Sequence, residues 1–211
     1  MRAAVTDAAV GVAVADDPGG LNAFLRPGCA AALWRRHTPP DVQAWLDDLA
    51  PDALPRARVV LRPAGVADMV RRICDAAALP AGGERSWLEA DIAALAGTFA
   101  DLMSAPFLRM RLDAITTNAC RRFHVDAITA RLVCTYRGTG TQYGISTDGN
   151  DPARVFTVAT GAPIVLRGTR WPEPPASGLL HRSPPIEGTG ETRLVLVLDP
   201  MEGPEDDMHG M

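Results

Sequence analysis

Long apolar runs and closely spaced cysteines are both missing from this chain of 211 residues. No apolar stretch approaches the roughly 20 residues that a helix needs to span a bilayer. An acid, Asp7, interrupts the N-terminal segment, which makes it a poor signal peptide. No Cys-x-x-Cys pair occurs, so neither a zinc knuckle nor a secreted disulfide framework is expected from Cys29, Cys74, Cys120 and Cys134. We therefore expect a cytoplasmic protein without membrane association.

An excess of positive charge is missing as well, since 25 acidic residues outnumber 21 basic ones and the formal net charge is −4. Because phosphate binding favours a basic surface, this balance argues against a nucleic-acid partner. One group of arginines nevertheless concentrates in the second half of the chain: Arg109, Arg111, Arg121, Arg122, Arg131 and Arg137. Such a local excess suggests an anionic ligand, although a solvated charged face would look the same. The substrate could be a small molecule or a protein side chain, and the oligomeric state is left open.

Hydrophobic residues make up 47% of the chain, enough for a sizeable core. The chain divides near Pro106. Before it, apolar residues recur at helical spacing over 42–49, 66–74 and 87–103, and 57–63 resembles a short strand. Residues up to about 36 fit either strands or buried helix. We expect residues 1–105 to form a mainly helical α/β flanking region.

Strand-like segments dominate the second half, separated by clusters of Gly, Pro, Asn and Asp. Several short strands with turn signals favour a sandwich or a barrel. We therefore expect an α+β protein whose β-core spans 106–200, followed by a frayed acidic tail over 201–211. The segments are 107–117, 131–136, 154–159, 163–166 and 193–198.

The most informative feature is a set of four residues: His124, Asp126, His181 and Arg193. Two imidazoles and a carboxylate form one face of an iron coordination sphere and leave other positions open. Arg193 opens an apolar strand, and a guanidinium binds carboxylate bidentately. The bland alternatives are a histidine hydrogen-bonded to a nearby aspartate and a strand-end arginine that reaches solvent.

This set, in this order and in a β-rich setting, resembles the Fe(II)/2-oxoglutarate-dependent oxygenase superfamily over residues 107–199. The resemblance implies a double-stranded β-helix (a jelly roll, cupin-like) with N-terminal helices packed on it. It also implies that His124, Asp126 and His181 bind iron and that Arg193 pairs with the distal carboxylate of 2-oxoglutarate. The whole chain is also similar to a bacterial family of uncharacterised domains, through Phe-His-Val-Asp, residues 134–142 and His-Arg-Ser-Pro-Pro.

The superfamily often adds a hydroxyl or amide that binds 2-oxoglutarate. Asn118, Thr135, Tyr136 and Gln142 are candidates. We favour Tyr136, because a phenol can donate to a carboxylate while its ring packs, although a core aromatic is an equal alternative. The segment 139–143 is interpreted as a substrate loop or an ordinary hairpin.

Three functions remain open at this point. The first is an Fe(II)- and 2-oxoglutarate-dependent oxygenase acting on an unidentified substrate. The second is a non-catalytic protein of the same fold that handles zinc or iron, because imidazole and carboxylate also suit zinc. The third is a cupin-type enzyme without 2-oxoglutarate, with Glu187 or Glu191 as an extra ligand. Cys120 and Cys134 lack an activating partner and are expected to be buried apolar residues.

Overall fold

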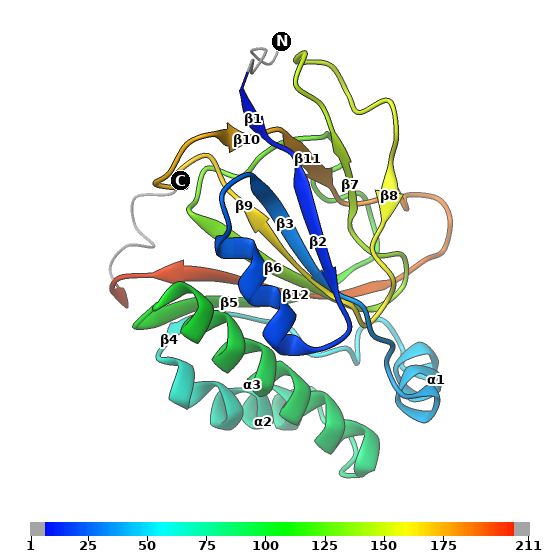
Figure 1. Ribbon diagram of the computed structural model, residues 1–211. Helices are drawn as coiled ribbons and strands as arrows, with labels where there is room; N and C mark the ends of the chain where they lie inside the picture. Colours follow the sequence, from blue (N-terminus) through cyan, green and yellow to red (C-terminus); the bar gives the residue numbers. More distant parts are fainter. Residues whose placement is uncertain (1–6, 205–211) are drawn as a thin grey trace.

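A seven-stranded sheet, antiparallel except for one pair, forms the centre of the fold (Figure 1). The computed structural model describes residues 7–204. In spatial order the strands are β2 (Gly11–Ala15), β3 (Cys29–Trp34), β9 (Pro163–Arg167), β6 (Ala130–Arg137), β12 (Arg193–Met201), β5 (Phe107–Ile115) and β4 (Ala57–Leu61). Only β2 and β3 run parallel. Within the predicted tail 201–211, Met201 closes β12, and 205–211 lie outside the described residues.

A smaller sheet packs on one face of this central sheet. Its strands follow the order β11 (Leu179–Arg182), β7 (Gln142–Ile145) and β8 (Phe156–Thr157). A two-stranded pair, β1 (Ala8–Ala9) and β10 (Ala176–Ser177), lies beside it. A buried apolar cluster joins the two layers, with Val133, Ile164 and Val195 from the large sheet against Leu179 from the small one. The two sheets therefore share a core of their own.

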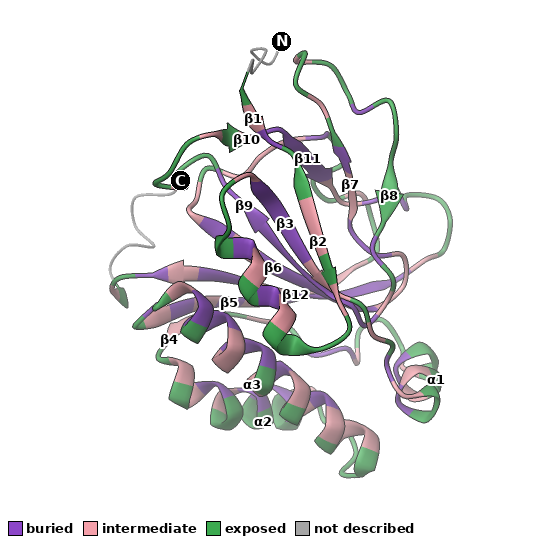
Figure 2. Cartoon of the chain, in the orientation of Figure 1, coloured by how far each residue is buried: buried purple, intermediate pink, exposed green. Residues whose placement is uncertain are grey.

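Helices cover the opposite face of the large sheet. They are α1 (Pro40–Asp48), α2 (Val66–Ala76) and α3 (Gly83–Met103), with short 3-10 helices η1 (Pro18–Leu25) and η2 (Pro63–Gly65). Figure 2 shows α2 and α3 with buried residues on one side and exposed residues on the other, as expected for amphipathic helices. Ser104 ends α3 in the left-handed conformation (φ 50°), and Pro106 follows it. The three predicted helices are confirmed.

Alternation along the strands separates two environments. In β12, Leu194, Leu196 and Leu198 belong to the core beneath the helices. The alternate residues Arg193 and Val195 point the other way, because successive side chains in a strand face opposite sides of the sheet. The same alternation in β5 and β6 places charged residues on the face toward the small sheet. One face of the sheet is thus a dry helix-covered core, and the other carries the polar residues.

The structure differs from the sequence-based expectation in three respects. The ambiguous N-terminal segments form strands β2 and β3, and with β4 they join the large sheet, so the first half of the chain shares a core with the second. The strand expected over 154–159 shrinks to Phe156–Thr157, and β7 and β11 were not foreseen. The hairpin interpretation of 139–143 is wrong, because β6 and β7 belong to different sheets. Within residues 7–204, no helix is long and apolar enough to cross a bilayer.

Candidate metal centre

The side chains of His124, Asp126 and His181 lie close together, although His181 is distant from the other two in the sequence. His124 lies on the connection between β5 and β6, and His181 lies in β11. The two histidines form an isolated β-bridge, with both N–H to O distances at 3.0 Å. One ligand atom from each of the three side chains lies within 4.8 Å of the others. The backbone bridge thus fixes two imidazoles and a carboxylate around one point.

The imidazoles face the carboxylate through their Nε2 atoms. His124 Nε2 lies 3.5 Å from Asp126 Oδ1, and His181 Nε2 lies 2.9 Å from Asp126 Oδ2. On its far side, His124 Nδ1 lies 2.8 Å from the Arg122 carbonyl, which can only accept a hydrogen bond. Nδ1 therefore carries a proton, and in the neutral ring Nε2 keeps its lone pair toward Asp126. A metal-binding histidine has the same arrangement, with its other nitrogen donating to a carbonyl.

The protonation preferences of the two histidines differ. A hydrogen bond to the Asp126 carboxylate raises the pKa of His124, against the opposing effect of burial. Burial lowers the pKa of His181 despite the same carboxylate, so this imidazole is neutral at neutral pH. A neutral imidazole is the form that binds a metal ion. Burial of His181 therefore favours the neutral form that a metal ion binds.

Asp126 is held in place by a buried network. Arg131 Nη1 lies 2.7 Å from Asp126 Oδ1, while its Nε and Nη2 donate to Asp199 at 2.6 and 2.9 Å. Burial alone would raise the pKa of Asp126, but the adjacent imidazoles of His124 and His181 and the charge of Arg131 hold it well below its usual range. Asp126 Oδ2 is buried and accepts no well-directed hydrogen bond. A cation shared with the imidazoles would satisfy this oxygen, so the donor set fits a divalent metal.

A close approach of the chain supports the loop that carries Asp126. Thr169 N–H donates to the Asp126 carbonyl at 2.8 Å, and Gly168 N–H donates to the Thr129 carbonyl at 2.9 Å. A Cβ on Gly168 would lie 1.9 Å from the Ile128 carbonyl oxygen, a distance no side chain tolerates. Only glycine allows the two segments to touch here.

A cavity of about 120 Å³ adjoins the two histidines, and Arg193 lies in its wall. Arg193 is only 1% exposed. Its Nε donates to the Thr139 carbonyl at 2.6 Å, and its Nη2 donates to Thr135 Oγ1 at 3.3 Å. Within residues 7–204 it forms no ion pair with a carboxylate. Burial lowers the pKa of this guanidinium to about 10, so it remains a cation without a close counter-ion.

Tyr136 is not at this site. Because Thr135 and Tyr136 are neighbours in β6, they face opposite sides of the sheet. Tyr136 is fully buried beneath the helices, and its hydroxyl donates to Asp91 Oδ2 at 2.6 Å. Thr135 is the residue that contacts Arg193. The core-aromatic alternative describes Tyr136, and the hydroxyl beside Arg193 belongs to Thr135.

The other candidate side chains already have partners outside the metal cluster. Asn118 accepts hydrogen bonds from the N–H groups of Ile186 and Glu187, and thereby holds a turn. Gln142 accepts from Arg182 at 2.8 Å. Glu191 accepts a hydrogen bond from Thr139 N–H. Neither Glu187 nor Glu191 joins the metal cluster in the described part of the chain. No extra acidic ligand of the cupin type is therefore found there.

Part of the predicted arginine group lies at the site. Arg111 and Arg131 line the cavity, whereas Arg137 donates to the Leu49 carbonyl on the helix side. Asp199, fully buried among these arginines, was missed by the sequence reasoning. The alternation of β12 could have indicated Asp199. Leucines occupy positions 194, 196 and 198, so Arg193 and Asp199 lie together on the opposite face of the strand. Cys120 is exposed at the cavity, contrary to the expectation of a buried cysteine, while Cys134 is buried as expected.

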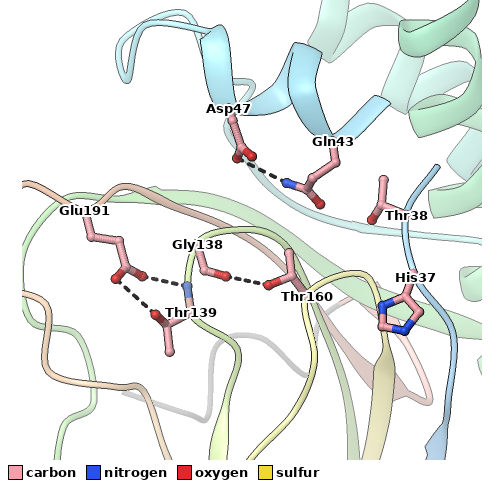
Figure 3. A pocket seen from close by; sticks show the side chains of 8 residues that line it. All are labelled: His37, Thr38, Gln43, Asp47, Gly138, Thr139, Thr160 and Glu191. Atoms are coloured by element: carbon pink, nitrogen blue, oxygen red, sulfur yellow. Dashed lines mark hydrogen bonds between the residues drawn. The ribbon is translucent and has the colours of Figure 1, made fainter. Parts of the chain in front are cut away.

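A larger hollow of about 620 Å³ lies elsewhere, and Figure 3 shows the side chains around it. Gln43 donates to Asp47, Thr160 donates to the Gly138 carbonyl, and Glu191 accepts from Thr139. None of the three clustered ligands lines it. Thr38 Oγ1 in its wall is buried without a hydrogen-bond partner, but the two clustered histidines line the smaller cavity, so the candidate site lies there despite the difference in size.

Residues 15–199 match the family described as "Protein of unknown function (DUF1826)". The chain belongs to this family. No curated protein matches the sequence. Among solved structures, the chain is similar to dioxygenase for auxin oxidation 1 from Arabidopsis thaliana in a binary complex with 2-oxoglutarate. That match has a TM-score of 0.53 and 13% identity, and covers 93% of this chain and 94% of that one. The rice dioxygenase for auxin oxidation gives 0.49 and 18%, covering 94% and 84%.

At 13% identity, the likeness to the Arabidopsis structure concerns the fold. The fold is the α+β double-stranded β-helix with N-terminal helices that the superfamily resemblance implied. Its two sheets enclose the cluster of His124, Asp126 and His181, in the type of fold that 2-oxoglutarate oxygenases use. Fold and donor set thus agree.

Proposed function

We propose that this chain is an Fe(II)- and 2-oxoglutarate-dependent oxygenase of the hydroxylase type. The observation that carries the proposal is the pairing of two features in one cavity. A histidine–aspartate–histidine cluster lies beside a buried arginine for which the described residues provide no acidic partner. A metal alone would explain the cluster, but not Arg193, because a buried charge without a counter-ion is costly.

The protein groups have separate roles in this proposal. His124 Nε2, His181 Nε2 and one oxygen of Asp126 would hold the iron, while Arg131 fixes the other oxygen. Arg193 would bind the distal carboxylate of 2-oxoglutarate, with Thr135 beside it. When bound, iron and 2-oxoglutarate supply the oxidation, in which dioxygen is consumed, 2-oxoglutarate is decarboxylated to succinate and a substrate C–H bond is oxidised.

The walls of the cavity would protect this chemistry. Val133 and Val195 are buried and line the cavity beside the histidines, so part of the surface next to the metal is apolar. Exclusion of water strengthens the interaction between Arg193 and a carboxylate, because the local dielectric falls. The chain thereby supplies binding, orientation and shielding, and it needs no nucleophile.

The test is anaerobic addition of Fe(II), then 2-oxoglutarate, to the metal-free protein. A weak visible charge-transfer band that needs both components is expected, and aerobic turnover should release succinate. His181→Ala should abolish both signals, whereas His37→Ala, an exposed histidine outside the cluster, should leave them intact. Retention of zinc without any response to 2-oxoglutarate would instead support the metal-handling alternative.

A further inference from the structure

A second cation, Arg111, lies in the same cavity wall as Arg193 but at a different position. Arg193 stands opposite Ile115, and Arg111 stands opposite Val197, on the adjacent strands β12 and β5. Four residues of strand separate the two positions, which corresponds to about 13 Å at roughly 3.3 Å per residue. One small dicarboxylate held at Arg193 and at the metal therefore does not account for both arginines.

The two arginines also differ in accessibility. Arg193 lines the cavity and is only 1% exposed. The side chain of Arg111 is 24% exposed and still lines the cavity. Arg111, unlike Arg193, is therefore accessible to a ligand that enters the cavity from solvent.

The charge of Arg111 is poorly compensated. The acid within ion-pair distance is Asp199, at 3.7 Å, and that carboxylate already accepts two hydrogen bonds from Arg131 and one from Arg109. Asp113 is a second acid near Arg111, beyond ion-pair distance. The Nε of Arg111 is buried and has no hydrogen-bond partner. Burial and the neighbouring Arg131 charge together lower the pKa of Arg111. An incoming anion would satisfy both the charge and the free donor.

The remaining charged groups of the cavity leave an excess of positive charge. Asp113 lies between Arg111 and Ile115 on the same face of β5 and is the one acid that lines the cavity in the described part of the chain. Arg182 also lines it and pairs with the neutral Gln142 and the Phe123 ring. Arg131 is neutralised by two aspartates. The cations outnumber Asp113, so an acidic ligand is favoured over a basic one.

We propose that Arg111 is a substrate-binding residue and that the substrate is a small organic acid whose carboxylate binds there. This inference rests on the proposed function and specifies its substrate class. The adjacent apolar surface from Ile115, Val195 and Val197 would hold the carbon skeleton between Arg111 and the metal. Asp113 would accept a hydrogen bond from a donor group next to the acid.

The probes are acetate, butanoate and phenylacetate, each with its primary amide. Binding is measured by calorimetry on protein loaded with Ni(II), which prevents turnover, and saturated with 2-oxoglutarate. At least one acid should bind roughly 10-fold or more tightly than its amide. Arg111→Gln should reduce that acid to the level of the amide, and Arg111→Lys should restore part of the difference.

Arg58→Gln is the matched control, because Arg58 stands directly opposite Arg111 on β4 but is exposed and does not line the cavity. It should leave acid binding unchanged. The proposal is overturned if no acid in the panel binds, if acids and amides bind alike, or if Arg111→Gln binds acids like the wild type. Binding of 2-oxoglutarate is recorded separately. If it fails in the wild type, the proposed function falls, and the acid panel on Ni(II)-loaded protein alone still decides the role of Arg111.

Discussion

Replacement of Arg193 by methionine separates a ligand-binding arginine from a structural one. Burial lowers its pKa from 12.5 to about 10. At 1.36 kcal/mol per unit, this corresponds to a cost of about 3 kcal/mol for keeping the guanidinium charged in the folded protein. Methionine, which is apolar and of similar length, removes that cost.

The substitution also removes two hydrogen bonds, to the Thr139 carbonyl and to Thr135 Oγ1. Each is worth on the order of 1–1.5 kcal/mol, so the loss nearly cancels the gain. We therefore expect the free energy of unfolding of metal-free Arg193→Met to lie within about 1 kcal/mol of the wild type. A structural arginine paired with buried acids would instead cost about 3–5 kcal/mol.

Binding of 2-oxoglutarate should respond in the opposite way. Loss of a desolvated carboxylate partner typically costs about 2–5 kcal/mol, which corresponds to a roughly 30-fold or larger increase in Kd. Urea unfolding of the metal-free protein and calorimetry of the Ni(II)-loaded protein measure the two quantities. A variant destabilised by about 3 kcal/mol or more, or one that binds 2-oxoglutarate like the wild type, would refute the reasoning.

Three further outcomes are expected. Arg131→Met should lower the free energy of unfolding by about 3–5 kcal/mol, because it leaves the fully buried Asp199 with weaker partners; urea titration measures this, and a loss below about 1 kcal/mol would contradict it. Tyr136→Phe should cost about 1–2 kcal/mol through its hydrogen bond to Asp91 and leave 2-oxoglutarate binding unchanged, as calorimetry would show. Iodoacetamide should label the exposed Cys120 first, and Ni(II) with 2-oxoglutarate should slow labelling; equal rates would argue against a shared cavity.

The sequence alone determined much of the fold, because local patterns carry it. Apolar residues at helical spacing predicted the three helices, although α3 begins at Gly83, earlier than the predicted residue 87. Short strand-like segments, separated by turn residues, predicted β5, β6, β9 and β12. The short strands β7 and β11 were not recognised, since four-residue segments contain too little periodicity and are held by pairing with distant partners.

The residue types at the site were also readable from the sequence. His124, Asp126, His181 and Arg193 were selected by their chemistry and order, and the fold brings all four to one cavity or its edge. Tyr136 was favoured as the hydroxyl beside Arg193, but it lies on the opposite face of β6. The sequence does not say which face of a strand lies toward which layer. A one-residue difference in β6 decides this, and Thr135 is on the side of Arg193.

Only the tertiary structure decided the electrostatics of the cavity. Asp199 neutralises Arg131 and partly compensates Arg109, which leaves Arg111 and Arg193 as the cations with the weakest acidic partners among the paired strands. In the sequence, these four arginines all lie in strand-like segments with apolar neighbours, and nothing distinguishes them. The difference arises from strand register, which sets the carboxylate that each guanidinium can reach. Composition and pattern thus specify which groups are present, whereas register and burial specify which of them remain available for a ligand.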